Sequence, residues 1–141
     1  MSAVSKLADT RAKVFAIQDE MAKHEQLDIP IVHYFAKGVY AREMTMPAGS
    51  IVVGKIHKYS QINILSKGEI SVLTEEGMKR VQAPFTLVAG PGVKRAMYAH
   101  TECVWTVFHG TDETDVETIE SQFIAQDERG YLAFCAQLEE K

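Results

Sequence analysis

The chain has 141 residues, which is enough for one ordinary domain and too few for two. Hydrophobic residues make up 46% and charged residues 24%, so the composition predicts a folded domain rather than a disordered chain. With 15 Lys and Arg against 19 Asp and Glu, the formal net charge is −4. This balance argues against binding of extended nucleic acid, because neutralising phosphates requires a basic surface, but it leaves room for a small cationic pocket.

Residues 1–30 are predicted to form an N-terminal helical segment. Apolar side chains recur at the spacing of one helix face, which predicts a helix from Thr10 to Leu27. The residues of this apolar stripe are Val14, Phe15, Ile17 and Met21. The tripeptide Asp28-Ile29-Pro30 is expected to end the helix, because proline cannot continue it. Neither a secretory signal nor a run of about 18 apolar residues is visible, so we expect no association with a membrane.

Residues 31–110 are predicted to form a β-barrel. Glycine, proline or serine interrupts this region about every six to ten residues, and segments rich in β-branched and aromatic residues lie between the interruptions. The predicted strands are Val32–Phe35, Val39–Met46, Ile51–Ile56, Ile62–Leu65, Glu69–Thr74, Met78–Gln82, Phe85–Val88, Val93–Ala99 and Cys103–Phe108. Glu75-Glu76-Gly77 predicts a hairpin turn. Strands of this length and spacing are typical of an antiparallel sandwich or barrel, and no segment between them is long enough for a βαβ crossover helix.

Residues 111–141 are predicted to be helical again. Thr114 followed by Glu117 has the spacing of a capping box and predicts the start of a helix. The apolar face behind this start consists of Val116, Ile119 and Phe123. Gly130 interrupts the pattern, and a second short helical turn is expected to present Tyr131, Phe134, Cys135 and Leu138. We expect both amphipathic ends of the chain to pack against the barrel or against a second copy of the chain.

The segment from Gly49 to Gly68 carries the most informative spacing in the sequence. Gly49 is followed after five residues by Lys55, then by Ile56 and His57, after three more residues by Gln61, and after six more by Gly68. This spacing resembles the first motif of the cupin superfamily, glycine–x5–His–x–His–x3–Glu–x6–glycine. The two glycines and the second histidine match. Lys55 stands in place of the first histidine and Gln61 in place of the glutamate.

A weaker resemblance covers the second cupin motif, proline–x–glycine–x2–His. Its counterpart is Gly90-Pro91-Gly92-Val93-Lys94-Arg95, with Arg95 at the position of the third histidine. The resemblance implies a small jelly-roll barrel with these positions on its inner wall. A cupin metal centre commonly uses three His and one Glu around iron, manganese or zinc, and here only His57 remains as a ready ligand. We therefore expect no metal and no other cofactor, with His57 as the ligand if a metal does bind.

The same substitutions predict a pocket for an anion. Alternation along a strand places Lys55 and His57 on one face of one strand and Gln61 and Asn63 on one face of the next, with Arg95 entering from the facing segment. Converging cations and amides suit a phosphate or carboxylate. We expect Tyr40 and Tyr98 to stack on a ring of the ligand. The alternative is that Lys55 and Arg95 reach the rim or pair with Glu43 or Glu102. His109 is expected only to end the last strand.

Three functional hypotheses follow. The first is a metal-independent cupin that binds a small anionic ligand, such as a phosphorylated sugar or a nucleotide-type molecule, in its barrel. The second is a cupin enzyme, either a metal-dependent oxygenase or isomerase, or a metal-free epimerase in which His57 acts as the base. The third is a virion or assembly protein in which the barrel is an interaction scaffold.

The string Tyr34–Gly54 is also similar to small cupin-like proteins encoded by tailed bacteriophages. The matching pieces are Gly38-Val39-Tyr40-Ala41-Arg42 and Met46-Pro47-Ala48-Gly49. This resemblance implies a phage protein that sequesters a nucleotide-type signal of its host. Cys103 and Cys135 have no metal-site spacing and are expected to be reduced thiols, which points to a cytoplasmic protein, in the host cytoplasm if phage-encoded. A homo-oligomer is expected under all three hypotheses, because the apolar stripes at both ends need partners.

Overall fold

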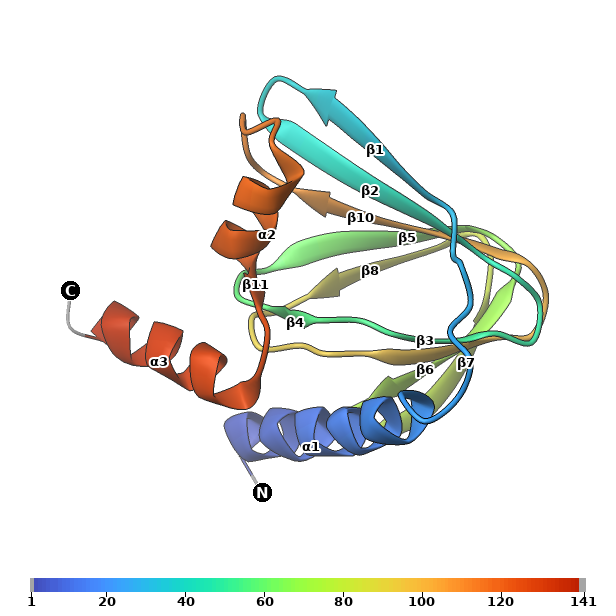
Figure 1. Ribbon diagram of the computed structural model, residues 1–141, viewed down its shortest axis with the longest axis horizontal. Coiled ribbons are helices and arrows are strands. Elements are labelled where there is room, and N and C mark those ends of the chain that lie inside the picture. Colours follow the sequence, from blue (N-terminus) through green and yellow to red (C-terminus); the bar gives the residue numbers. More distant parts are fainter. Residues whose placement is uncertain (1, 140–141) are drawn as a thin grey trace.

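The computed structural model describes residues 2–139, which form a barrel of two facing antiparallel sheets with helices at one end and along one side (Figure 1). The larger sheet has the strand order β1-β2-β10-β5-β8, the smaller one has the order β3-β9-β6-β7, and β4 pairs with β11. The strands are β1 (Ile31–Ala36), β2 (Val39–Met46), β3 (Ile51–Val53), β4 (Ile56–His57), β5 (Gln61–Lys67), β6 (Glu69–Thr74), β7 (Gly77–Gln82), β8 (Phe85–Ala89), β9 (Ala96–Ala99), β10 (Cys103–His109) and β11 (Ile124–Ala125). The helices are α1 (Ala3–Met21), α2 (Val116–Phe123) and α3 (Glu128–Glu139). The predicted mainly-β antiparallel barrel with helical ends is confirmed.

The strand boundaries follow the predicted pattern except at two places. At these places the backbone forms hydrogen bonds that do not belong to the regular pairing of two strands. The expected strand Ile51–Ile56 is divided, because the Gly54 amide donates to the Arg95 carbonyl at 2.9 Å and β4 then pairs with β11 instead of β9. The expected strand Val93–Ala99 begins only at Ala96, since the Val93 carbonyl accepts from the amide of His57. The predicted hairpin turn joins β6 to β7, with Gly77 at a φ of 99°.

The helices differ more from the sequence predictions. α1 begins at Ala3 rather than Thr10, because the Ser2 hydroxyl oxygen accepts a hydrogen bond from the Ser5 amide, and it ends at Met21 rather than Leu27. The predicted capping box at Thr114 is wrong, since the N-cap of α2 is Asp115. The Asp115 carboxylate accepts from the amide of Thr118 at 3.1 Å and from its hydroxyl at 2.6 Å. The expected short final turn is a full helix, α3, of 12 residues.

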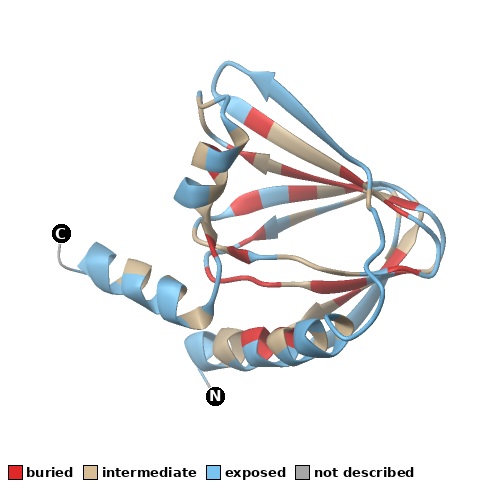
Figure 2. Ribbon diagram, in the orientation of Figure 1, coloured by how far each residue is buried: buried red, intermediate tan, exposed pale blue. Residues whose placement is uncertain are grey.

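An apolar core fills the closed end of the barrel between the two sheets. Trp105 and Met44 project from the larger sheet, and Met97 and Val72 project from the smaller one. The buried residues of this cluster are Met44, Met46, Leu65, Ile70, Val72, Met97, Ala99, Cys103, Trp105 and Val107. Figure 2 shows buried residues along the strands and on one face of α1, where Val14 is fully buried. No helix within residues 2–139 is long and apolar enough to cross a bilayer.

Arg11 ties both terminal helices to one turn of the barrel. Its Nε and Nη2 donate to the Glu128 carboxylate on α3 at 2.6 and 2.8 Å, and its Nη1 donates to the Gly92 carbonyl at 3.0 Å. Its guanidinium group also lies 4.7 Å from the centre of the Tyr131 ring. Gly92 has a φ of 87°, and a Cβ added there would lie 2.6 Å from the Tyr131 hydroxyl oxygen. The turn therefore requires glycine, and α1 and α3 hold it from the outside.

We expect Glu128→Gln to lower the free energy of unfolding by about 2 kcal/mol. The variant leaves the Arg11 guanidinium, whose side chain is 4% exposed, without its carboxylate. Breaking a fully buried pair costs about 3–5 kcal/mol, and the 40% exposure of Glu128 reduces this cost. Urea unfolding followed by circular dichroism measures the change. The matched control is Glu102→Gln, which removes an exposed pair with Lys67 and should cost less than about 1 kcal/mol. Equal losses in the two variants would contradict the role of Arg11.

Candidate functional site

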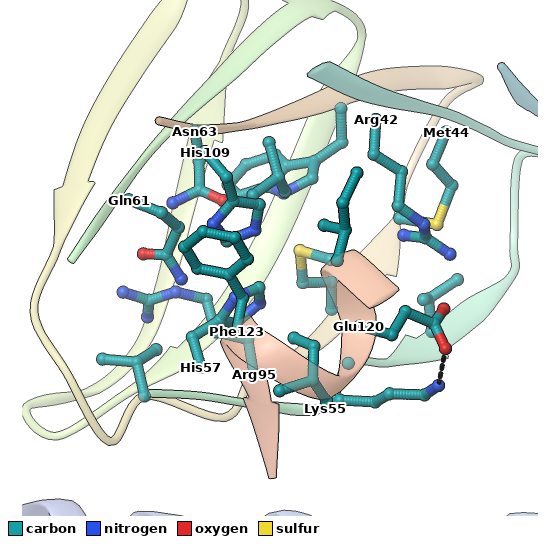
Figure 3. Close-up of a pocket in the computed structure, with 18 of the residues that line it drawn as sticks. Arg42, Met44, Lys55, His57, Gln61, Asn63, Arg95, His109, Glu120 and Phe123 are labelled. Carbon is teal, nitrogen blue, oxygen red and sulfur yellow. Dashed lines mark hydrogen bonds and ion pairs between the residues drawn. The ribbon is translucent and has the colours of Figure 1, made fainter. Parts of the chain in front are cut away.

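A pocket of about 170 Å³ opens inside the barrel beneath α2 (Figure 3). The two sheets provide its walls, and α2 with β11 covers its mouth. The lining residues are Tyr40, Arg42, Met44, Val52, Val53, Gly54, Lys55, His57, Gln61, Asn63, Val93, Arg95, Met97, Trp105, Val107, His109, Ile119, Glu120, Phe123 and Ile124. The pocket thus lies directly above the apolar core, inside the same barrel, and its walls carry polar side chains.

Strand register creates the polar wall on the larger sheet. In the pairing of β2, β10 and β5, Arg42 lies opposite Val107, and Val107 lies opposite Asn63. On the mouth side of this row, Tyr40 pairs with His109, and Gln61 begins β5 next to them. Because side chains two residues apart on a strand share a face, these residues all point into the barrel. The row on the core side holds Met44, Trp105 and Leu65, so polarity increases toward the mouth.

The opposite wall comes from the segment that leaves the smaller sheet. Gly54 and Lys55 connect β3 to β4, and Arg95 lies immediately before β9. The Gly54 carbonyl accepts from the Lys94 ammonium at 2.7 Å, and the Gly54 amide donates to the Arg95 carbonyl. These bonds fix the backbone beside the pocket. Lys94 itself is buried outside the pocket, with its Nζ 4.3 Å from the centre of the Phe15 ring on α1.

Helix α2 is attached to the mouth of the barrel by a few specific contacts. Its residue Glu120 accepts from Lys55, with an Nζ to Oε2 distance of 3.4 Å (Figure 3). The Lys58 amide donates to the Phe123 carbonyl at 2.8 Å, and its ammonium donates to the carbonyl of Ser121 at 3.0 Å. Ile124 then pairs with His57 in the β11–β4 ladder. These contacts place an apolar cover, with one carboxylate, over a polar wall.

Five buried side-chain atoms have no hydrogen-bond partner within the part of the chain that the structure describes. All five belong to pocket-lining residues: His57 Nδ1, Gln61 Oε1, Asn63 Nδ2, Arg95 Nε and His109 Nδ1. Elsewhere in the described chain, buried polar side chains are bonded, as folded proteins require. Each unpartnered buried group costs about 1–3 kcal/mol, so their concentration in one cavity is a feature that needs an explanation.

The electrostatic field of the pocket is positive. Burial first, and then the neighbouring His109, Arg42, Arg95 and Lys94, lower the pKa of His57 to about 3. Burial also lowers the pKa of His109, and that of Arg95 despite the opposing charge of Glu75. Both imidazoles are therefore neutral near pH 7, and their rings stack with centroids 5.4 Å apart. None of the ion pairs formed by residues 2–139 includes Arg42 or Arg95, so no carboxylate within this part of the chain is in direct contact with either guanidinium group.

Six of the seven residues predicted from the sequence line this pocket. They are Tyr40, Lys55, His57, Gln61, Asn63 and Arg95. Tyr98 does not, because the alternation on β9 turns Met97 inward and Tyr98 outward, where it packs edge-to-face on His100. Lys55 does form an ion pair, as the alternative reading allowed, but with Glu120 rather than Glu43 or Glu102.

Sequence reasoning missed several residues of the site. Arg42 could have been found, because it lies two residues from both Tyr40 and Met44 on a predicted strand and therefore shares their face. His109, expected only to end its strand, has its side chain in the pocket and stacks at 4.8 Å on Phe123. Glu120 and Phe123 come from α2, and no local signal places that helix over the mouth of the barrel.

The lining does not suit a divalent cation. Among residues 2–139, no group of three His, Cys, Asp or Glu side chains is placed to hold a metal ion. His57 and His109 are available nitrogen donors, but the carboxylate of Glu120 pairs with Lys55. Two unbalanced guanidinium groups add repulsion. The chemistry of the donor set is that of a site for negative charge.

Comparison with solved structures shows the cupin fold. A cupin superfamily protein from Desulfitobacterium hafniense matches at a TM-score of 0.53 and 9% identity, covering 63% of this chain and 83% of that one. Ectoine synthase from P. lautus matches at 0.55 and 9%, covering 74% of this chain and 81% of that one. Salicylate 1,2-dioxygenase from Pseudaminobacter salicylatoxidans matches at 0.54 and 12%, covering 82% of this chain and 34% of that one. No family model matches the sequence, and no curated protein matches it significantly.

The low pKa of His57 predicts that acid destabilises the protein. The unfolded chain binds a proton at this residue below its ordinary pKa of about 6.5, whereas the folded chain does so only near 3. Stability should therefore fall as pH drops from about 6.5 to 3, by on the order of 4 kcal/mol from this residue. Denaturant unfolding at a series of pH values measures the slope. His57→Asn should flatten the slope, and an unchanged slope in that variant would contradict the assignment.

Proposed function

We propose that this cupin-fold chain binds a small organic anion in its barrel through its own side chains, without a metal ion. The observation that carries the proposal is the set of five buried, unpartnered polar atoms, all of which belong to residues that line one pocket. A ligand that hydrogen-bonds to them would offset the cost of burying them. The positive field of Arg42 and Arg95 selects a negative ligand over a neutral one.

The individual groups define what the ligand offers. The Arg95 Nε and the Asn63 Nδ2 are donors, so they suit the oxygens of an acid group. The Gln61 Oε1 is an acceptor and needs a donor, such as a hydroxyl or an N–H. The neutral imidazoles of His57 and His109 each have an unpartnered Nδ1 that donates or accepts according to its tautomer. The pocket therefore suits an anion that also carries a hydrogen-bond donor.

Phosphorylated sugars and nucleotide-type molecules are the first candidates of this kind. Both combine an anionic group with hydroxyl donors. If the resemblance of Tyr34–Gly54 to tailed-phage proteins extends to function, the ligand would be a nucleotide-type signal that the protein removes from the host. A capacity to sequester requires tight binding without turnover, and a cavity that an attached helix covers favours slow release.

We expect a panel of organic acids, sugar phosphates and cyclic nucleotides to contain at least one ligand that raises the melting temperature by several degrees. A ligand at 100 times its Kd stabilises the folded state by about 2.7 kcal/mol. Arg95→Gln should abolish this shift, because it removes the buried donor and its charge. Arg80→Gln is the matched control, since Arg80 lies on the exposed strand β7, outside the pocket, and pairs with Glu69 of β6. The absence of any shift with the whole panel would overturn the proposal.

A metal-free acid–base enzyme is the second candidate, and the neutral histidine pair favours it. An imidazole kept unprotonated near pH 7 can accept a proton from a bound substrate, and a bound anion would raise the low pKa of His57 toward the value that a general base needs. Turnover of a sugar or keto acid that bound in the melting panel should then be lost in His57→Ala while binding persists. Metal analysis of the same purified protein, with and without chelator, separates this reaction from a metal-dependent one. If the wild-type protein binds the substrate without turning it over, the binding function stands and the enzyme hypothesis is excluded for that substrate.

A further inference from the structure

The two guanidinium groups of the pocket lie on opposite sides of it. Arg42 comes from β2 on the larger sheet, and Arg95 comes from the segment that enters β9 on the smaller sheet. In Figure 3 the Arg42 guanidinium lies on the side of Glu120, whereas that of Arg95 lies beside Gln61 on the other side. His57 is drawn between them, and both guanidinium groups act on its pKa. The positive charge of the pocket is thus divided between two ends.

Each end carries about one unit of positive charge. At the first end, Arg42 and Lys55 contribute two positive charges and Glu120 contributes one negative charge, which leaves one positive charge. At the second end, Arg95 has no ion-pair partner within residues 2–139 and lies beside the neutral Gln61 amide; the carboxylate of Glu75, which acts on it, is not part of the pocket lining. A ligand with a single acid group would satisfy one end and leave the other uncompensated.

The pocket that holds the two ends is small, and much of its lining is apolar. The indole of Trp105, the ring of Phe123 and the side chains of Val107 and Met97 contribute to that lining, together with the neutral imidazoles of His57 and His109. The cavity volume is about 170 Å³, and an apolar cavity of about 150 Å³ holds a benzene molecule. A single ring or a chain of a few carbons therefore fits between the guanidinium groups, whereas a base joined to a ribose and a phosphate would have to extend out of the mouth of the pocket.

We propose that the ligand is a compact organic dianion whose two acid groups are separated by a single ring or a short apolar spacer, one group at Arg42 and the other at Arg95. The inference rests on the proposed anion-binding function and narrows its ligand class. It favours dicarboxylates and acids of that shape over phosphate monoesters, which concentrate both charges on one group. Because positive charge lies at both ends of the pocket, the site selects the distance between the two acid groups of a ligand as well as the sign of their charge.

The test compares ligands of equal shape and different charge. The probes are terephthalate and isophthalate, which hold two carboxylates at different separations on one ring, and glutarate and adipate, which hold them on a chain. The monomethyl ester of each diacid removes one charge and adds one methyl group, and benzoate keeps the ring with a single carboxylate. Isothermal titration calorimetry at low salt measures the Kd of each probe. We expect at least one diacid to bind tenfold or more tightly than its own monomethyl ester.

Two single variants then locate the acid groups. Arg42→Gln and Arg95→Gln should each weaken binding of the diacid by tenfold or more. In each variant the Kd of the monomethyl ester should then lie within about threefold of the Kd of the diacid. Arg80→Gln, on the outer surface, should leave the preference unchanged. Melting curves show whether each variant is folded. If Arg95→Gln is not folded, Arg95→Lys is used instead; it retains the charge and should retain the preference for the diacid over its ester. Arg42→Gln still tests whether the second acid group binds at Arg42.

The outcomes separate this inference from the function on which it rests. If the diacids and their esters bind equally well, or if Arg42→Gln has no effect on the diacid, the two-ended ligand is overturned and the anion-binding function stands. If glucose 6-phosphate or a cyclic nucleotide binds more tightly than every diacid and depends on Arg95 alone, the same conclusion follows. If no acid, phosphate ester or nucleotide binds at all, both the inference and the proposed function are overturned.

Discussion

The antiparallel register of β2, β10 and β5 determines what this barrel contains. It aligns Arg42, Val107 and Asn63 in one inward-facing row, and it places Tyr40, His109 and Gln61 at the mouth beside that row. A shift of one residue in either pairing would turn these polar groups to the outside and bring their neighbours inward. On β5 the neighbours are isoleucines, so a shift of this strand would replace the Gln61 and Asn63 amides by apolar side chains.

The structure keeps this register although it buries polar groups and exposes apolar ones. Ile62 is 45% exposed on the outer face, while Gln61 and Asn63 are almost fully buried within the barrel. Hydrophobic burial alone favours the opposite arrangement by about 25 cal/mol per Å² of apolar surface. The compensation lies one row deeper, where Met44, Trp105 and Leu65 face the apolar side of the smaller sheet. Stability comes from that layer, and the rows above it are available for binding.

The two chain ends act on the site from opposite directions. α1 and α3 meet at Arg11, whose bond to the Gly92 carbonyl supports the turn that leads to Arg95. α2 covers the mouth and contributes the carboxylate that moderates the charge of Lys55. The wall that carries Arg95 and the cover that carries Glu120 are therefore both set by segments outside the barrel itself. This arrangement lets a small cavity present positive charge at two ends without an acidic residue between them.

The sequence by itself determined the barrel and most of the polar wall. The alternation of polar and apolar residues and the regular glycines predict the antiparallel sheets. The spacing from Gly49 to Gly68, together with that of Gly90 to Arg95, assigns Lys55, His57, Gln61 and Arg95 to the inside of the barrel. Local pattern suffices for these features because a strand has a strict period of two and a glycine turn has few alternatives. Tertiary structure alone decided that His109 and Glu120 join the site, that Tyr98 faces away, and that Arg42 and Arg95 lie on opposite sides. Those facts depend on which strands pair and where α2 docks, and such long-range contacts leave no signal in a local window of sequence.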